Sequence, residues 1–163
     1  MTHFERIEEF VKALPRTGAV AGLDFGDKTI GYAVSDGLRN IATPLLTIRR
    51  VKFTQDAAEL IKQLEARAIV GIVLGLPRNM DGSEGPRAQA TRAFARNLSR
   101  LCPLPIAFWD ERLSTVAAER ALLEADTSRK RRGEVIDHVA AGYILQGALD
   151  RMSHIMREQN RNG

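Results

Sequence analysis

The chain has 163 residues, 44% hydrophobic and 27% charged, which is ordinary for one compact globular domain and too short for two sizeable ones. No stretch approaches the roughly 20 apolar residues that a membrane-spanning helix needs, and Glu5, Glu8 and Glu9 argue against a secretory signal or a transit peptide. The net charge of +4 permits polyanionic partners without requiring them. We therefore expect a cytoplasmic protein that does not associate with membranes.

The first residues predict a helical extension in front of the main domain. Apolar residues recur at helical spacing between residues 3 and 14, and Pro15 ends the pattern. Such a helix would pack on the domain as an added flap. We place the boundary so that residues 1–18 form the extension and residues 19–157 form a single domain.

The segment AVAGLDFGDKTIGYAVSD, residues 19–36, carries the clearest pattern in the chain. It predicts a buried strand that ends at Asp24, a turn at Gly26-Asp27-Lys28, and a second strand at residues 29–35. A carboxylate at the end of a buried strand is costly unless its desolvation is compensated. Asp24 therefore either hydrogen-bonds the turn backbone, as Asp often does, or faces a bound cation.

The rest of the chain predicts one mixed sheet. A third short strand follows at residues 45–48, and short connections between the first three strands imply antiparallel pairing. Helices and strands then alternate, which favours parallel strands joined by right-handed crossovers. The expected later elements are a helix near 54–64, a strand at 68–76, a helix at 88–98, a strand at 105–109, a helix at 114–125 and a helix at 134–157. The fold class is thus α/β, with a five-stranded sheet (three antiparallel strands, then two parallel ones) and helices on both faces.

Carboxylates occur at three places where an apolar element ends or is interrupted: Asp24, the pair Asp110-Glu111, and Asp137 near the start of the last helix. Strand ends and the loops after them converge at one edge of such a sheet. Like charges held together repel unless a cation intervenes. Oxygen ligands without His or Cys suit Mg²⁺ or Mn²⁺, and a two-metal site would support phosphodiester cleavage.

Each carboxylate also has a purely structural interpretation. Asp137 in the first turn of a helix would complement the helix dipole. The pair Asp110-Glu111 would be a solvated strand end, with Glu111 pairing with Arg112 or Arg129. Because successive strand residues face opposite sides of a sheet, only one of Asp110 and Glu111 should point into a site. The apolar pattern around them does not decide which.

A basic segment, expected to be a loop at residues 128–133, lies just before Asp137 in the chain. Its cations are candidates for contacts with nucleic-acid phosphates; they are Arg129, Lys130, Arg131 and Arg132. Arg78, in the polar loop PRNMDGSEGP, is a weaker candidate for the same role. A run of four cations is also compatible with ordinary solvated surface.

Four segments in this order resemble the YqgF family, also called RuvX, of small bacterial proteins with a ribonuclease H-like fold. They are GLDFGDKTIGYAVSD at 22–36, GLPRNMDGSEGPRAQ at 75–89, DERLST at 110–115, and a segment within 124–141 that contains SRKRRGEVIDHVAA. The resemblance runs from about residue 19 to residue 150. The extra segment at residues 1–18 departs from the family pattern, because members commonly begin close to the first strand.

The resemblance implies a hydrolase, a divalent-metal-dependent endonuclease in which Asp24, Glu111 and Asp137 are the catalytic residues and the metal ligands. It is this resemblance that selects Glu111 over Asp110. Family members are described as nucleases that mature the 5′ end of 16S ribosomal RNA in ribosome biogenesis, and earlier as Holliday junction resolvases by analogy to RuvC. The implied partner is a nucleic acid, either a structured RNA or a DNA junction.

Two other functions fit parts of the sequence. A D-x-G turn between two strands also occurs in actin-like ATPases, but those enzymes place nucleotide between two copies of the fold and this chain has room for one. A non-catalytic nucleic-acid-binding module would keep the basic segment and need no metal. The sequence does not distinguish RNA from DNA, because phosphate contacts carry no base information, and it does not distinguish a monomer from a homodimer.

Overall fold

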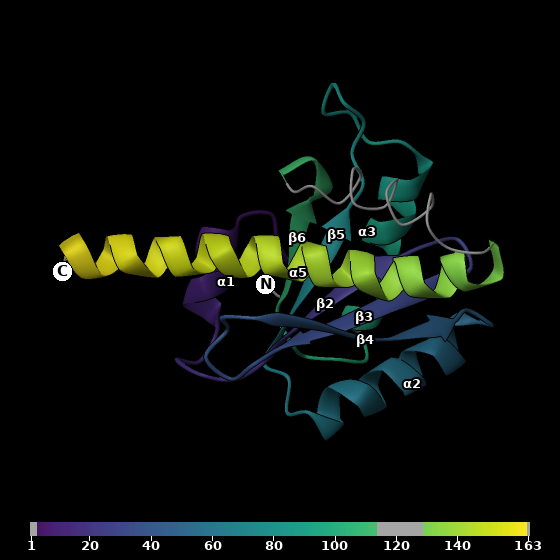
Figure 1. Cartoon of the computed structure of the whole chain (residues 1–163), viewed down its shortest axis with the longest axis horizontal. Coiled ribbons are helices and arrows are strands. Elements are labelled where there is room, and N and C mark those ends of the chain that lie inside the picture. Colours follow the sequence, from purple (N-terminus) through teal and green to yellow (C-terminus); the bar gives the residue numbers. More distant parts are fainter. Residues whose placement is uncertain (1–2, 114–128, 163) are drawn as a thin grey trace.

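The computed structural model describes residues 3–113 and 129–162, with side chains for residues 3–113 and 138–161. In this part of the chain one six-stranded sheet carries helices on both faces (Figure 1). The elements are β1 (His3–Phe4), α1 (Ile7–Ala13), β2 (Val20–Phe25), β3 (Thr29–Ser35), β4 (Ala42–Arg49), α2 (Phe53–Ala66), β5 (Gly71–Leu76), α3 (Pro86–Ser99), β6 (Ile106–Asp110), the short 3-10 helix η1 (Glu111–Leu113) and α5 (Arg129–Asn162).

The strands are ordered β1-β6-β5-β2-β3-β4 across the sheet. β2, β3 and β4 pair antiparallel, while β5 lies parallel to both β2 and β6. This topology confirms the predicted fold class. The turn at residues 26–28 is confirmed as well, because the backbone N–H of Gly26 donates to the carbonyl oxygen of Thr29 at 2.9 Å.

The strand count differs from the prediction because the N-terminal extension adds a strand of its own. His3 and Phe4 pair parallel with Ile106 and Ala107 of β6. The helix expected over residues 3–14 therefore begins only at Ile7. A two-residue strand has no periodicity of its own, and its apolar Phe4 fits a helical pattern equally well.

The extension is fixed to the sheet by packing and by one buried cation. The Phe10 side chain is fully buried, and its ring occupies the space over Gly71 at the start of β5. Arg39, in the connection between β3 and β4, is 7% exposed and donates to the carbonyl oxygens of Pro15 and Gly18 at 2.7 and 2.8 Å. It thereby ties together the segment that leads from α1 into β2.

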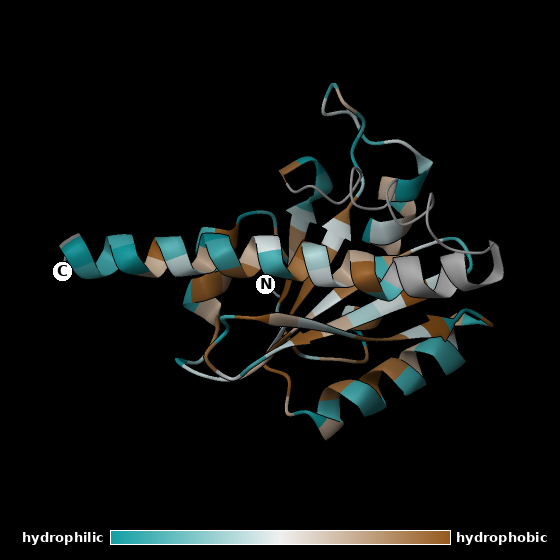
Figure 2. Cartoon of the chain, viewed as in Figure 1, coloured by the Kyte–Doolittle hydropathy of each residue, from teal (hydrophilic) through white to brown (hydrophobic). Residues whose placement is uncertain are grey.

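Apolar side chains form one layer on each face of the sheet. The first layer lies between the sheet and helices α2 and α3, and the second lies between the sheet and helices α1 and α5. Figure 2 shows the apolar strands between these helices and the hydrophilic C-terminal end of α5. None of the described helices is both long and apolar enough to cross a membrane.

Helix α5 is longer than predicted and crosses the sheet, so that its C-terminal turns project past the strands (Figure 1). Its backbone is already helical from Arg129, where the sequence predicts a loop over residues 128–133. Four consecutive cations and Gly133 were the signals for that loop. Arg and Lys are nevertheless good helix formers, and one glycine in a helix costs only about 1 kcal/mol.

Candidate active site

Asp24 is a buried carboxylate near the C-terminal end of β2. It is 3% exposed and pairs in register with Gly31 of β3. Gly22, two residues earlier, lies against Leu145 and the backbone of Ala141 in α5. Because residues two apart share a face of a strand, Asp24 lies on the face that α5 covers.

Glu111 follows β6 and lies on the same face of the sheet. A Cβ atom placed on Gly75 of β5 would be 3.2 Å from Glu111 Oε1 and 2.5 Å from Ile144 Cδ1 of α5. The missing side chain at Gly75 thus leaves the space into which the carboxylate of Glu111 extends. Since β5 lies between β2 and β6, Asp24 and Glu111 flank Gly75 from its two neighbouring strands.

Asp110 is engaged in a different set of contacts. Its Oδ2 accepts from Arg112 Nη2 at 2.7 Å, and its Oδ1 accepts from the backbone N–H of Arg112 at 3.0 Å. The Arg112 guanidinium holds the pKa of the Asp110 carboxyl below its ordinary value. Trp109 belongs to the apolar layer under α5 and Phe108 to the opposite layer, so alternation puts Asp110 on the α2–α3 face. Glu111, the first residue of η1, is placed on the α5 face by its contact with the space over Gly75.

The third predicted ligand, Asp137, lies in α5, but its side chain is outside the described residues. Its backbone precedes Ala141 by one helical turn, and the carbonyl oxygen of Ala141 is 3.0 Å from the Cβ position over Gly22. His138 is partly buried, with Nδ1 3.0 Å from Thr47 Oγ1 of β4. The side chains of the basic residues 129–132 also lie outside the described part, although their backbone is helical.

The donor chemistry of this face fits a hard divalent cation. Asp24 and Glu111 offer carboxylate oxygens only, as Mg²⁺ and Mn²⁺ prefer. Among the described residues no three His, Cys, Asp or Glu side chains come together as a metal site. The described part therefore supplies two carboxylates, and completing a three-carboxylate set depends on Asp137.

The turn that follows Asp24 is braced from the other face of the sheet. Arg50 Nη1 donates to the carbonyl oxygens of Gly26 and Asp27 at 2.6 and 2.9 Å. Its guanidinium lies 4.3 Å from the centroid of the Phe25 ring, which stacks on Phe94 at 4.4 Å. These groups line an open groove of about 380 Å³ between the β4–α2 connection and α3. Arg50 thus restrains the backbone that positions Asp24.

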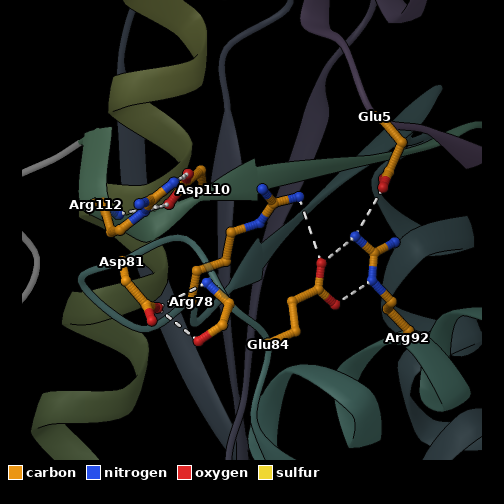
Figure 3. A network of polar contacts seen from close by, with 8 residues as sticks. Glu5, Arg78, Asp81, Glu84, Arg92, Asp110 and Arg112 are labelled. Atoms are coloured by element: carbon orange, nitrogen blue, oxygen red, sulfur yellow. Dashed lines mark hydrogen bonds and ion pairs between the residues drawn. The ribbon is translucent and has the colours of Figure 1, made fainter.

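Arg78, the weaker phosphate-binding candidate, belongs to a network of alternating charges (Figure 3). Its Nη2 lies 3.5 Å from Glu84 Oε2, and its side chain is 29% exposed. Arg92 donates to both oxygens of Glu84 at 2.6 and 2.8 Å and forms an ion pair with Glu5 of the extension at 2.7 Å. Hydrogen bonding from Arg92 lowers the pKa of the Glu84 carboxyl.

Sequence reasoning missed Arg92, and it named Arg112 only as a possible partner of Glu111, whereas the structure pairs Arg112 with Asp110. Arg92 links α3 to the N-terminal extension, and Arg112 links the end of β6 to the loop after β5. Arg112 is adjacent to Glu111 in the sequence, and that adjacency was the only available signal. The sequence offers no signal for Arg92, because its partner Glu5 is distant in the chain and comes near Arg92 only through the pairing of β1 with β6.

Comparisons with known proteins agree with this architecture. A family model described as "RuvX: Holliday junction resolvase" matches residues 18–151. Proteins named "Putative pre-16S rRNA nuclease" from Cereibacter sphaeroides (strain KD131 / KCTC 12085) and Paracoccus denitrificans (strain Pd 1222) are each 76% identical to the chain, covering 94% and 95% of it and 96% and 98% of their own lengths. A relative of the same name from Rhodobacter capsulatus is 72% identical, over 93% of this chain and 95% of its own.

One solved structure is similar in fold. It is described as "T. thermophilus RuvC in complex with Holliday junction substrate", and it matches with a TM-score of 0.50 over 85% of this chain and 96% of its own. The sequence identity is 12%, so the similarity concerns the fold alone. It supports the predicted α/β fold, a mixed sheet with helices on both faces.

Proposed function

Because this chain belongs to the RuvX family, we propose that it is a divalent-metal-dependent endonuclease that hydrolyses phosphodiester bonds. Its substrate is the 5′ end of pre-16S ribosomal RNA, and it acts in the cytoplasm. The name shared by relatives that are 76% identical over nearly the whole chain supports the substrate. The observation that carries the chemistry is that the buried Asp24 and Glu111 lie on the same face of the sheet, the one that α5 covers.

Asp24, Glu111 and Asp137 are the residues that would hold the metal, as Mg²⁺ or Mn²⁺ in a two-metal site. When bound, such ions supply an activated water and stabilise the leaving oxygen of an in-line displacement. The chain's own part is to fix the carboxylates before the substrate arrives. Asp24 is held in the body of a strand, and Glu111 lies in the space left by Gly75.

The phosphate backbone of the substrate would be held by Arg78 and by the basic residues of α5. Cations close to a cluster of carboxylates are suited to gripping phosphates on either side of a scissile bond. Arg78 is partly exposed next to the strand end that carries Asp110 and Glu111. The basic residues are Arg129, Lys130, Arg131 and Arg132.

The description of the matching family model favours a second candidate, resolution of a Holliday junction. The two candidates make different demands on assembly. Cutting a symmetric junction at two equivalent positions requires a two-fold dimer. A single cleavage near the end of an RNA does not require a dimer. Sedimentation of the full chain with and without each substrate separates the two requirements.

The test is a cleavage screen of precursor 16S RNA and a four-way DNA junction side by side, with Mg²⁺, Mn²⁺ or chelator. We expect divalent-dependent cleavage of the RNA, abolished by Asp24→Asn because the buried position then carries a neutral amide. Asp27→Asn is the matched control, since it makes the same change three residues later in the exposed turn. Full cleavage by Asp24→Asn would remove Asp24 from the chemistry. Salt-sensitive binding without cleavage of either substrate would instead support a non-catalytic binding module.

A further inference from the structure

The loop between β5 and α3, residues 77–85, projects from the end of the sheet near Glu111, and we call it the arm (Figure 1). Near its tip lies Met80, whose side chain is 93% exposed, more than any other large hydrophobic side chain in the described part of the chain. A single exposed apolar residue is common on protein surfaces. What sets Met80 apart is the way in which the arm holds it.

The tip of the arm is fixed by its own hydrogen bonds. The backbone N–H of Asn79 donates to Ser83 O, and that of Gly82 donates to Asn79 O, both at 2.9 Å. The backbone N–H and the hydroxyl of Ser83 donate to Asp81 Oδ1 at 2.9 and 2.6 Å. Gly82 has a φ of +89°, which favours glycine. The tip therefore keeps one conformation although it is not packed on a core.

The arm is also anchored from outside. Arg112 Nη1 donates to the carbonyl oxygen of Met80 itself at 3.3 Å. The same guanidinium donates to Asp110 Oδ2 at 2.7 Å (Figure 3). At the base of the arm, Glu84 is bound by Arg92 through two hydrogen bonds. Both ends of the arm are thus tied to regular secondary structure. These contacts restrain the backbone at Met80, while its side chain is exposed to solvent.

The anchoring places Met80 relative to the candidate site. Arg112 directly follows Glu111, and Leu76, the last residue of β5 before the arm, pairs in register with Asp110. The arm therefore begins two residues after Gly75, beside the end of β6, and close to the Glu111 carboxylate that extends over Gly75. A nucleic acid bound at the carboxylates would lie next to the tip of the arm.

We propose that Met80 is a wedge that inserts between two bases of the substrate where base stacking is already interrupted, at a branch or at a boundary between duplex and single strand. Methionine is among the apolar residues that nucleic-acid-binding proteins insert between base steps. A protein partner would instead need a wide contact surface, which one side chain at a loop tip does not provide. The wedge rests on the proposed function, because it concerns the same substrate.

The test places 2-aminopurine, whose fluorescence rises when it is unstacked, at the interrupted step of two substrates. One is an RNA duplex with a single-stranded 5′ end, and the other is a four-way DNA junction. Binding is measured without added divalent ions, so that no cleavage intervenes. We expect the wild-type chain to raise the fluorescence severalfold. Met80→Ala should leave it at the level of the free substrate and weaken binding about tenfold, in line with the loss of one buried apolar side chain.

Two variants control for size and for general surface change. Met80→Leu keeps a large apolar side chain and should retain the fluorescence rise. Leu38→Ala removes a side chain that is 72% exposed in the β3–β4 connection, at the opposite end of the sheet, and should behave as wild type. A fluorescence rise with Met80→Ala equal to that of wild type would overturn the wedge.

Failure of the wedge and failure of the nuclease proposal give different results. An unstructured single strand has no duplex step to open, so Met80→Ala and wild type should cleave it equally with Mn²⁺. Absence of cleavage by the wild-type chain on every substrate would overturn the nuclease proposal and leave the fluorescence result intact. If the wild-type chain binds without any fluorescence rise, the wedge proposal is wrong. The exposed Met80 side chain would then contact a protein partner and not the bases.

Discussion

Gly22 and Gly75 lie on the same face of the sheet under α5, and alanine at the two positions should have opposite consequences. At Gly22 a Cβ would stand 2.6 Å from Leu145 Cβ and 3.0 Å from the Ala141 carbonyl oxygen. Both atoms are fixed to the α5 backbone, so the helix itself must shift. At Gly75 the nearest atom, at 2.5 Å, is Ile144 Cδ1, the end of a side chain that can rotate.

The two costs can be estimated from overpacking. Added methyl groups in packed cores cost about 1–3 kcal/mol, and we place Gly22→Ala at the top of that range because its neighbours cannot rotate away. For Gly75→Ala we expect about 1 kcal/mol. In both variants roughly 0.5–1 kcal/mol of this cost is offset, because alanine has less conformational freedom than glycine in the unfolded chain. With that offset, Gly22→Ala should lower the melting temperature of a chain of this size by roughly 4–10 °C.

Gly75→Ala, the variant that costs less stability, should have the larger effect on metal binding and cleavage. The Cβ of Gly75→Ala would stand 3.2 Å from Glu111 Oε1, so the carboxylate must move by a few tenths of an ångström. If Glu111 is a metal ligand, Gly75→Ala should weaken Mn²⁺ binding, measured by calorimetry, and slow cleavage, although the fold is nearly as stable as wild type. Urea denaturation gives the stability of both variants.

The reasoning would be refuted by the reverse pattern. Mn²⁺ affinity unchanged in Gly75→Ala would mean that Glu111 does not hold the metal in the arrangement seen here. Gly22→Ala with wild-type stability would mean that α5 does not pack on β2 as closely as the distances indicate.

Two further predictions concern titration. Burial raises the pKa of Tyr32 to about 12. The contribution of Tyr32 to stability is therefore complete below the ordinary pKa of 10.0 and is lost as the pH rises toward 12. In a Tyr143→Phe variant Tyr32 is the remaining tyrosine, and ultraviolet absorbance should show no phenolate until that range; ionisation near pH 10 would contradict its burial. The pKa of Glu84 is lowered by Arg92, so the anchor at the base of the arm is stabilising above the ordinary pKa of a glutamate and weakens as the pH falls through the depressed value. The protection of the arm amides, taken relative to the intrinsic exchange rate at each pH, should therefore fall in acid. Glu84→Gln should show the lower protection already at neutral pH, whereas wild-type protection in that variant would show that Glu84 does not anchor the arm.

Much of the sheet was predictable because its strands are marked by strong local signals. The turn glycine after Asp24 and the apolar runs of β5 and β6 locate the central strands, although β5 begins only at Gly71, three residues after the predicted start at residue 68. The choice between Asp110 and Glu111 was not predictable from pattern, because Phe108 and Trp109 are both apolar and do not show which face α5 covers. The two carboxylates are distinguished by contacts that exist only in the folded chain, those of Asp110 with Arg112 and those of Glu111 at Gly75 under α5.

Other features depend on long-range pairing and left no local trace. β1 exists because β6 offers it an edge, and the ion pair of Glu5 with Arg92 follows from that pairing. Arg39 adopts a φ of 62° and buries its guanidinium on backbone carbonyls, where a loop arginine would ordinarily be expected in solvent. The roles predicted for Asp137 and for residues 129–132 fall on side chains outside the described part and stay predictions.

The pairing of β1 with β6 also has a consequence for self-association. An open sheet ends in two rows of backbone N–H and C=O groups that can recruit strands from other molecules. At one edge of the sheet the outermost described strand is β1, which has only two residues. At the other edge β4 carries Pro44 beside an irregularity in its pairing with β3. Both margins are therefore poor templates for fibril growth, and the extension gives the chain this protection whether or not it takes part in cleavage.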